Sequence, residues 1–281
     1  RSIERWTAMK ININRLTYAT AGIEITRKCN LNCAHCLRGD SQNMDMPFEV
    51  IDDFLDHTQA IYHLVFTGGE PTLNLDGLRY FLDSAKRHNV FISSMEMTTN
   101  GTVQNQDLVD IIRDYNAYIC QFVYPEYRGS FPITIQISRD DFHDTDYEKS
   151  YQWYNDNLSD YAQIRYNNNG RFVLKSGRAN SIKYAFNQDN SLKKIQIKTT
   201  DNNPLCTQKN LIPVFHKNQV VVLCSLWVTA NGYLHSRMYA TWEDEDNNPD
   251  DIICHVRVNS AQDIVDAIEK YNAKKPFCIQ R

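Results

Sequence analysis

Three cysteines, Cys29, Cys33 and Cys36, lie close together directly after a strand-like run at residues 21–26. Their C-x3-C-x2-C spacing is too tight for useful disulfides between them, and a chain of 281 residues can bury a core without such cross-links. The spacing therefore favours metal ligands in a reducing compartment. Any fold of this chain has to place three thiols at the end of one strand.

A zinc site is the first alternative, because structural zinc takes four tetrahedral ligands that are often cysteines. His35 is a poor fourth ligand, since it lies between Cys33 and Cys36 in the chain. A second alternative, buried structural cysteines, predicts cysteines scattered on periodic faces, as we expect for Cys120 on a strand. Three thiolates in one loop fit a cubane iron-sulfur cluster better, with one iron left free of protein ligands.

Strand-like and helix-like runs alternate through the first two thirds of the chain. Hydrophobic patterns predict strands at residues 21–26, 62–67, 90–98, 117–123, 133–137 and 171–175. They predict helices within residues 48–61, 75–87, 107–115 and 147–158. Repeated β-α units without a nucleotide-binding glycine triplet indicate an α/β fold, a full or partial (β/α) barrel whose working loops follow the carboxyl ends of the strands.

The composition changes near residue 187, where polar stretches begin. We therefore expect a barrel domain over residues 1–186 and a small α+β extension over residues 187–281. Two β-rich runs, 220–228 and 233–238, flank Asn231-Gly232, which predicts a β-hairpin. A final helix at 261–271 is expected to pack on it.

Charge and hydropathy argue against nucleic acid and membrane as partners. The chain has 30 basic and 34 acidic residues and a net charge of −4, so charge does not favour nucleic-acid binding. No apolar run approaches the roughly 18 residues of a membrane span, and the first residues lack the apolar stretch of a signal peptide. We expect a soluble, cytoplasmic protein without a membrane partner.

Two motifs carry a resemblance to a known family. Residues 29–36, Cys-Asn-Leu-Asn-Cys-Ala-His-Cys, resemble the cysteine signature of the radical S-adenosylmethionine (SAM) superfamily. Residues 67–71, Thr-Gly-Gly-Glu-Pro, follow the second predicted strand and resemble the GGEP motif of that superfamily. Such a tetrapeptide alone is more often an ordinary turn, but the two motifs occur in the family's order. The resemblance implies a [4Fe-4S] cluster on Cys29, Cys33 and Cys36.

The resemblance also implies residues that contact SAM. It places the GGEP segment at the methionine amino group, and it places the ring of His35 near the adenine. The full set of cofactor-binding residues that it implies is His35, Thr67, Gly68, Gly69, Glu70, Pro71, Thr99, Asn100, Ser138 and Arg178. The ordinary alternative is a turn for Thr99 and Asn100, a cap at the end of a strand for Ser138, and a solvated arginine for Arg178.

An acidic loop, Asp140, Asp141, His143 and Asp144, carries residue types that bind metals. A similar D-x-F-H-D run occurs in members of the family. Asp residues before a helix more often satisfy its free amides. We therefore expect this loop to cap the following helix.

The resemblance implies an enzyme. An electron from the reduced cluster would cleave SAM to methionine and a 5′-deoxyadenosyl radical, which abstracts hydrogen from a peptide (RiPP) precursor or a small metabolite. A flavodoxin or ferredoxin would supply the electron. The alternatives are a nucleoside or sugar substrate, and a non-catalytic SAM-binding iron-sulfur sensor. Complete motifs favour the enzyme, because a sensor need not keep both.

The extension resembles a twitch or SPASM domain, which often holds auxiliary clusters. The cysteine expected just after the hairpin glycine is missing, since Ser236, Arg237 and Met238 stand there. We therefore interpret the extension as degenerate and without a cluster. The alternative is an auxiliary iron-sulfur cluster on Cys206, Cys224, Cys254 and Cys278.

Overall fold

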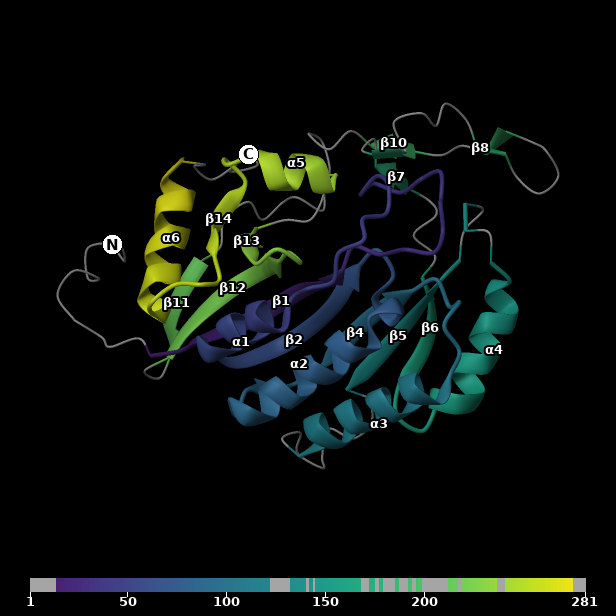
Figure 1. Cartoon of the computed structure of the whole chain (residues 1–281), viewed down its shortest axis with the longest axis horizontal. Coiled ribbons are helices and arrows are strands. Elements are labelled where there is room, and N and C mark those ends of the chain that lie inside the picture. Colours follow the sequence, from purple (N-terminus) through teal and green to yellow (C-terminus); the bar gives the residue numbers. More distant parts are fainter. Residues whose placement is uncertain are drawn as a thin grey trace.

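The computed structural model describes residues 14–121, 132–139, 142–143, 145–167, 172–174, 177–178, 185–186, 192–193, 196–198, 212–216, 219–236 and 241–274. These residues build an α/β fold around one open, mostly parallel sheet (Figure 1). Its strand order is β14-β13-β12-β1-β2-β4-β5-β6, with β11 beside β12 and β3 beside β2. Within the described residues the sheet does not close on itself, so it is a partial barrel.

The strands of the main sheet run from the first described residues almost to the last helix. They are β1 Leu16–Thr26, β2 Thr58–Gly68, β3 Phe91–Ile92, β4 Met95–Thr99, β5 Ile133–Ser138, β6 Gln163–Asn167, β11 Ile212–His216, β12 Gln219–Val228, β13 Tyr233–His235 and β14 Ile252–His255. Two small sheets pair β7 Phe172–Leu174 with β10 Gln196–Lys198, and β8 Ala185–Phe186 with β9 Leu192–Lys193.

The helices alternate with strands in the chain, and the first four α-helices connect parallel strands and pack on one another in chain order (Figure 1). They are α1 Phe48–Asp56, the short 3-10 helix η2 Pro71–Leu73, α2 Leu75–Arg87, α3 Gln106–Cys120, α4 Tyr147–Leu158, α5 Trp242–Asn247 and α6 Ala261–Lys274. Within the described residues no helix is both long and apolar enough to cross a membrane.

Local chemistry explains where these helices start. The side chain of Asn74 accepts a hydrogen bond from Gly77 N–H at the start of α2, and Asn105 does the same for Leu108 N–H at the start of α3. Such caps satisfy amides that lack a partner in the first turn. The buried residues then recur at helical spacing, and this pattern fixes the face that each helix turns to the sheet.

Most predicted elements are present. Helices α2 and α4 have the predicted bounds, and the hairpin of β12 and β13 turns at Asn231-Gly232. Strand β1 starts earlier than expected, at Leu16. The predicted strand 90–98 is divided into β3 and β4, and β6 was not predicted.

The predicted strand at 117–123 is wrong where the structure describes it. Residues 117–120 form the last turn of α3, and Cys120 is exposed there. Tyr115, Tyr118 and Ile119 are buried at helical spacing, and the hydroxyl of Tyr118 donates to the carbonyl of Val90 at 2.6 Å. Packing of this aromatic face keeps a β-prone sequence helical.

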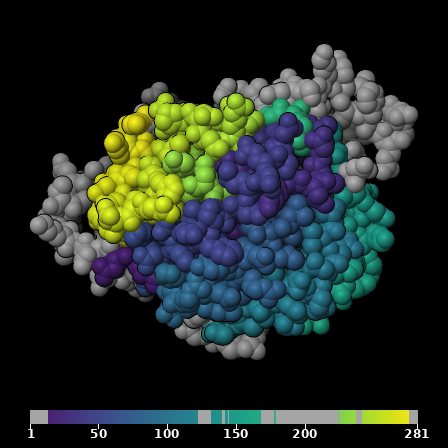
Figure 2. Space-filling view, viewed as in Figure 1, coloured from purple at the N-terminus to yellow at the C-terminus, as the bar shows by residue number. Residues whose placement is uncertain are grey.

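Strands β11 to β14 of the expected extension continue the main sheet. Strand β12 pairs in parallel with β1, in a register that joins Gly22 to Trp227 and Ile23 to Val228. Figure 2 shows the C-terminal segment, in green and yellow, lying directly against the purple N-terminal segment. The division at residue 187 stays a prediction.

Candidate functional site

The three cysteines lie in the loop that follows β1, at the carboxyl end of the parallel strands. All three are partly buried, and the N–H of Cys36 donates to the carbonyl of Cys33 at 3.1 Å. Burial raises the pKa of the Cys29 thiol, and the nearby charges of Glu70, Cys33 and Cys36 raise it further. The three thiols therefore lie near one another. Three sulfur donors in one loop fit an iron-sulfur cluster with one open iron.

The two glycines of the GGEP motif pass against the base of this cysteine loop. The N–H of Gly69 donates to the carbonyl of Thr26 at 2.9 Å, and the N–H of Glu70 donates to the carbonyl of Lys28 at 2.7 Å. A Cβ on Gly68 would lie 1.9 Å from the Thr26 oxygen, and one on Gly69 would lie 2.2 Å from the Lys28 oxygen. Only glycine permits this approach of two backbones. Pro71, next in the motif, begins η2.

Glu70 is buried and joins two strand ends. One carboxylate oxygen accepts hydrogen bonds from the hydroxyls of Thr72 and Thr99 at 2.6 and 2.7 Å. The other accepts from the N–H of Asn100 at 2.7 Å. Burial raises the pKa of Glu70, and these donors oppose the shift. The structure therefore assigns this carboxylate a role in fixing the turn after β4.

The turn after β4 also contacts the cysteine loop. The side-chain amide of Asn100 donates to Asn30 at 3.0 Å, and Asn30 donates to Thr102 at 2.9 Å. Asn100, expected near SAM, thus contacts the residue after Cys29, and Thr99, also expected there, precedes it at the end of β4. Thr67, in β2, pairs with Glu24 of β1, and Ser138 ends β5 at the same edge of the sheet.

Arg178, far along the chain, contacts the cysteine loop directly. Its backbone N–H donates to the carbonyl of Cys36 at 3.0 Å, and its Nε donates to the carbonyl of Cys33 at 3.0 Å. The guanidinium also pairs with Asp40 at 3.0 Å. The resemblance implied that the side chain of Arg178 contacts SAM. In its described contacts, this side chain instead holds the cysteine loop.

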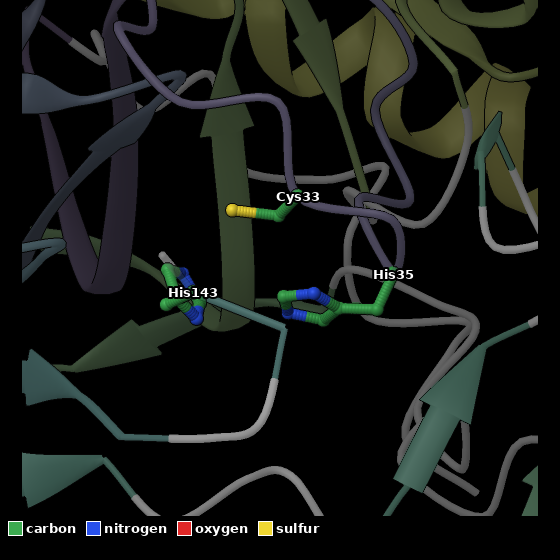
Figure 3. A group of neighbouring side chains, drawn as sticks. All are labelled: Cys33, His35 and His143. Carbon is green, nitrogen blue, oxygen red and sulfur yellow. The ribbon is translucent and has the colours of Figure 1, made fainter. Parts of the chain in front are cut away.

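His35 contacts two rings of the loop that follows β5. Its ring stacks on Phe142 at 4.9 Å between centroids, and the ring of His143 meets it edge-on at 5.0 Å. Figure 3 shows Cys33, His35 and His143 grouped together. The expectation that the acidic loop caps α4 is not confirmed for His143, because the capping side chain is that of Asp146. Asp140, Asp141 and Asp144 lie outside the described residues.

A buried ionic network holds the other side of the cysteine loop, and the sequence did not predict it. Glu24, fully buried in β1, accepts from Arg27 Nε at 2.6 Å and from Arg38 at 2.5 Å. It also accepts from the N–H of Ala230 at 3.0 Å and from the indole N–H of Trp242 at 2.9 Å. A carboxylate in the middle of an apolar strand was the available signal.

The network continues into α5. Glu245 pairs with Arg38 through both carboxylate oxygens, and Asp246 pairs with Arg27 at 2.6 and 2.8 Å. Asn231, in the turn of the hairpin, donates to Asp246 at 2.8 Å. The arginines lie just before and just after the cysteine run, so the network ties both ends of the loop to the C-terminal segment.

Comparisons with known proteins agree with this geometry. Residues 23–154 match the family model of the radical SAM superfamily. The match covers just under half of the chain. It contains the three cysteines, the GGEP motif and strands β2, β4 and β5. The family implies a [4Fe-4S] cluster and SAM, and the three-thiol donor set described above fits that cluster.

Individual relatives are distant. An uncharacterized protein of Methanocaldococcus jannaschii is 28% identical over 99 residues, which cover 33% of this chain and 34% of that protein. The match thus spans about a third of the curated relative. The solved structure of native anSMEcpe with bound AdoMet and the Cp18Cys peptide covers 91% of this chain and 82% of its own, at 11% identity and a TM-score of 0.53. SuiB of Streptococcus suis, bound to S-adenosylmethionine, is similar at 11% identity and a TM-score of 0.42 over 78% of this chain and 60% of SuiB. The anSMEcpe similarity shows the fold.

Proposed function

We propose that this chain is a radical SAM enzyme. Cys29, Cys33 and Cys36 would hold a [4Fe-4S] cluster, and SAM would bind at the carboxyl ends of β1, β2, β4 and β5. When bound, cluster and SAM would together supply a 5′-deoxyadenosyl radical, formed by reductive cleavage of SAM, that abstracts hydrogen from a substrate. A flavodoxin or ferredoxin would serve as the electron donor.

The contact between the two motifs carries this proposal. Two backbone hydrogen bonds join the GGEP segment to the base of the cysteine loop, Gly69 to Thr26 and Glu70 to Lys28. The same segment holds the turn at Asn100 through the carboxylate of Glu70. Motifs that are about forty residues apart in sequence are therefore neighbours in space, as one cofactor shared between them requires.

The residues of this chain have three tasks in that activity. The glycines of the motif let the backbone approach a ligand and leave carbonyls for an ammonium group. Thr99, Asn100 and Ser138 supply polar groups at the same edge of the sheet, and His35 supplies a ring for stacking on a base. Arg178 and the buried ionic network orient the cysteine loop, and correct placement of reacting groups is worth large factors in rate.

A peptide is the substrate class that we favour. The anSMEcpe structure contains a bound peptide beside AdoMet, and its fold covers most of this chain. A small metabolite, including a nucleoside or a sugar, is the competing outcome. Incubation of the enzyme with candidate precursor peptides, followed by mass spectrometry of the products, distinguishes them.

The central experiment measures cleavage of SAM. We expect anaerobically reconstituted protein to release 5′-deoxyadenosine when dithionite and SAM are added, and Cys33→Ala to abolish the release. Cys120→Ala is the matched control, because Cys120 is exposed at the end of α3. A protein that assembles the cluster and binds SAM without cleaving it would be a sensor. A protein that forms no iron-sulfur absorption would overturn the proposal.

We further propose a single cluster. Cys254 lies in β14, where burial raises the pKa of its thiol to about 12. Cys206, Cys278 and the side chain of Cys224 lie outside the described residues. About four irons per chain are expected for one cubane, and about eight would indicate the auxiliary cluster.

A further inference from the structure

We propose that the cluster-free chain has a mononuclear site for Zn²⁺, or a divalent metal of similar chemistry, built from Cys33, His35 and His143. This inference does not depend on SAM cleavage. It concerns the state of the chain before an iron-sulfur cluster is present. Because Cys33 is also a proposed cluster ligand, the zinc ion and the iron-sulfur cluster could not be bound at the same time.

The three ligand atoms already lie near one another. Cys33 Sγ and one ring nitrogen each of His35 and His143 are all within 4.8 Å of one another. Tetrahedral zinc, with bonds of about 2.3 Å to sulfur and about 2.0 Å to nitrogen, needs separations of about 3.5 Å. Side-chain rotations that bring the atoms about 1 Å closer would complete the site. Figure 3 shows the sulfur and the two imidazole rings around one space.

Contacts outside the three ligands hold them in place. Phe142 stacks on His35, and because Phe142 precedes His143 in the chain, the same loop brings both rings to His35. The peptide of Cys33 is held by two hydrogen bonds to its carbonyl, from Arg178 Nε and from Cys36 N–H. Groups that orient metal ligands in this way raise the affinity of a site.

The donor set selects the class of metal. One thiolate and two neutral imidazoles are ligands that suit zinc, whereas calcium and magnesium prefer oxygen. On binding, the Cys33 thiol would lose its proton to solvent as the sulfur-metal bond forms, and the imidazoles would bind as neutral bases. Water would occupy the fourth position, as in open zinc sites.

The decisive experiment uses Co²⁺ as a spectroscopic probe of zinc sites. The cluster-free chain, reduced and anaerobic, is titrated with Co²⁺ while the thiolate charge-transfer band and the visible bands of tetrahedral cobalt are recorded. We expect one equivalent to bind and Zn²⁺ to displace it. His143→Ala and His35→Ala should each weaken binding at least about tenfold, because even loss of a group that only orients a ligand costs that much.

Cys29→Ala is the matched control, because it removes a proposed cluster ligand that lies outside the three-residue site. It should leave the cobalt spectrum and affinity unchanged, whereas Cys33→Ala should abolish both. His143→Ala should still take up about four irons on reconstitution, which shows that its cluster ligands are intact. Unchanged cobalt affinity in both histidine variants would overturn the proposal. Loss of cobalt binding in Cys29→Ala equal to that in Cys33→Ala would also overturn it, since the cluster cysteines would then be the ligands.

The sharing of Cys33 gives a second test. Prior addition of one equivalent of Zn²⁺ should slow cluster reconstitution in the wild-type chain, measured as the rate of iron-sulfur absorption. The same addition should have a smaller effect on His143→Ala. Equal inhibition of the two proteins would contradict mutual exclusion at this site.

Discussion

The cysteine loop is held from two sides that differ in chemistry. Toward the C-terminal segment, full and partial charges are buried together: Glu24, Arg27 and Glu245 are almost inaccessible. Toward the ends of β2 and β4, on what we call the neutral side, backbone groups and uncharged side chains donate hydrogen bonds around one buried carboxylate, Glu70, and the cysteines and His35 are partly exposed. The comparison indicates a division of roles. The charged side fixes the loop in place, and the neutral side leaves surface for a ligand.

Removal of the Glu24 carboxylate should disrupt the charged side and have the largest expected effect on stability. In Glu24→Ala, Arg27 and Arg38 lose a buried partner, and the free energy of unfolding should fall by about 3–5 kcal/mol. Urea unfolding of the cluster-free chain measures this loss. Glu49→Ala, at an exposed position in the first turn of α1, is the control and should change stability by less than about 0.5 kcal/mol. Similar values for the two variants would mean that the buried charges do not stabilise the fold.

The free energy of unfolding should depend on pH because His235, in the C-terminal segment next to the charged side, is buried. His235, buried in β13, has a pKa that burial lowers to about 4. The folded chain therefore keeps this imidazole neutral, while the unfolded chain binds a proton below pH 6.5, so stability should fall as the pH is lowered. The loss should reach about 3 kcal/mol between pH 6.5 and pH 4.

The contribution of this histidine can be isolated by difference. Urea unfolding of the wild-type chain and of His235→Asn is compared at several pH values, since carboxylates titrate in both proteins. The wild-type chain should lose more stability than the variant below pH 6.5. Parallel curves would contradict this, because they would show that His235 binds a proton as readily in the folded chain as in the unfolded chain.

On the neutral side, a single methyl group should be enough to separate the two motifs. In Gly69→Ala, the new Cβ would lie 2.2 Å from the carbonyl oxygen of Lys28, so one of the two backbones has to move. A displacement of about 1 Å at a reacting centre costs about 100-fold in rate. We expect that loss in the release of 5′-deoxyadenosine. Glu49→Ala, exposed in the first turn of α1, is again the control and should keep the wild-type rate. Wild-type rates in Gly69→Ala would contradict a cofactor role for this contact.

The two sides also differ in how far the sequence predicted them. The cysteine run and the GGEP segment are short and continuous, and each follows a strand, so the sequence placed both at one edge of the sheet. Helices α2 and α4 were predicted with their bounds because apolar residues repeat at helical spacing inside capped segments. A feature can be predicted from the sequence when all of its residues lie in one short segment of the chain.

On the charged side, the carboxylate of Glu24 was visible in the sequence, but its distant partners could not be predicted. Trp242 and Glu24 are 218 residues apart in the chain, and Ala230 and Glu24 are 206 apart. No local pattern joins such residues, because their contact depends on β12 pairing with β1. The helical end of α3 was missed because its β-prone residues are helical only through packing of Tyr115 and Tyr118.

An exposed ion pair between α1 and the C-terminal segment offers the smallest expected effect. Arg257 Nε lies 3.0 Å from Asp53 in α1, and the two side chains are 67% and 32% exposed. In Asp53→Asn the free energy of unfolding should fall by no more than about 1 kcal/mol, because water and the entropy of long side chains offset the attraction. The loss should almost vanish in 1 M salt, where the screening length is about 3 Å. A cycle with Arg257→Gln isolates the coupling energy of the pair. A coupling above about 2 kcal/mol that persists in high salt would mean that exposed charges also join these regions strongly, and the contrast with the buried network would no longer hold.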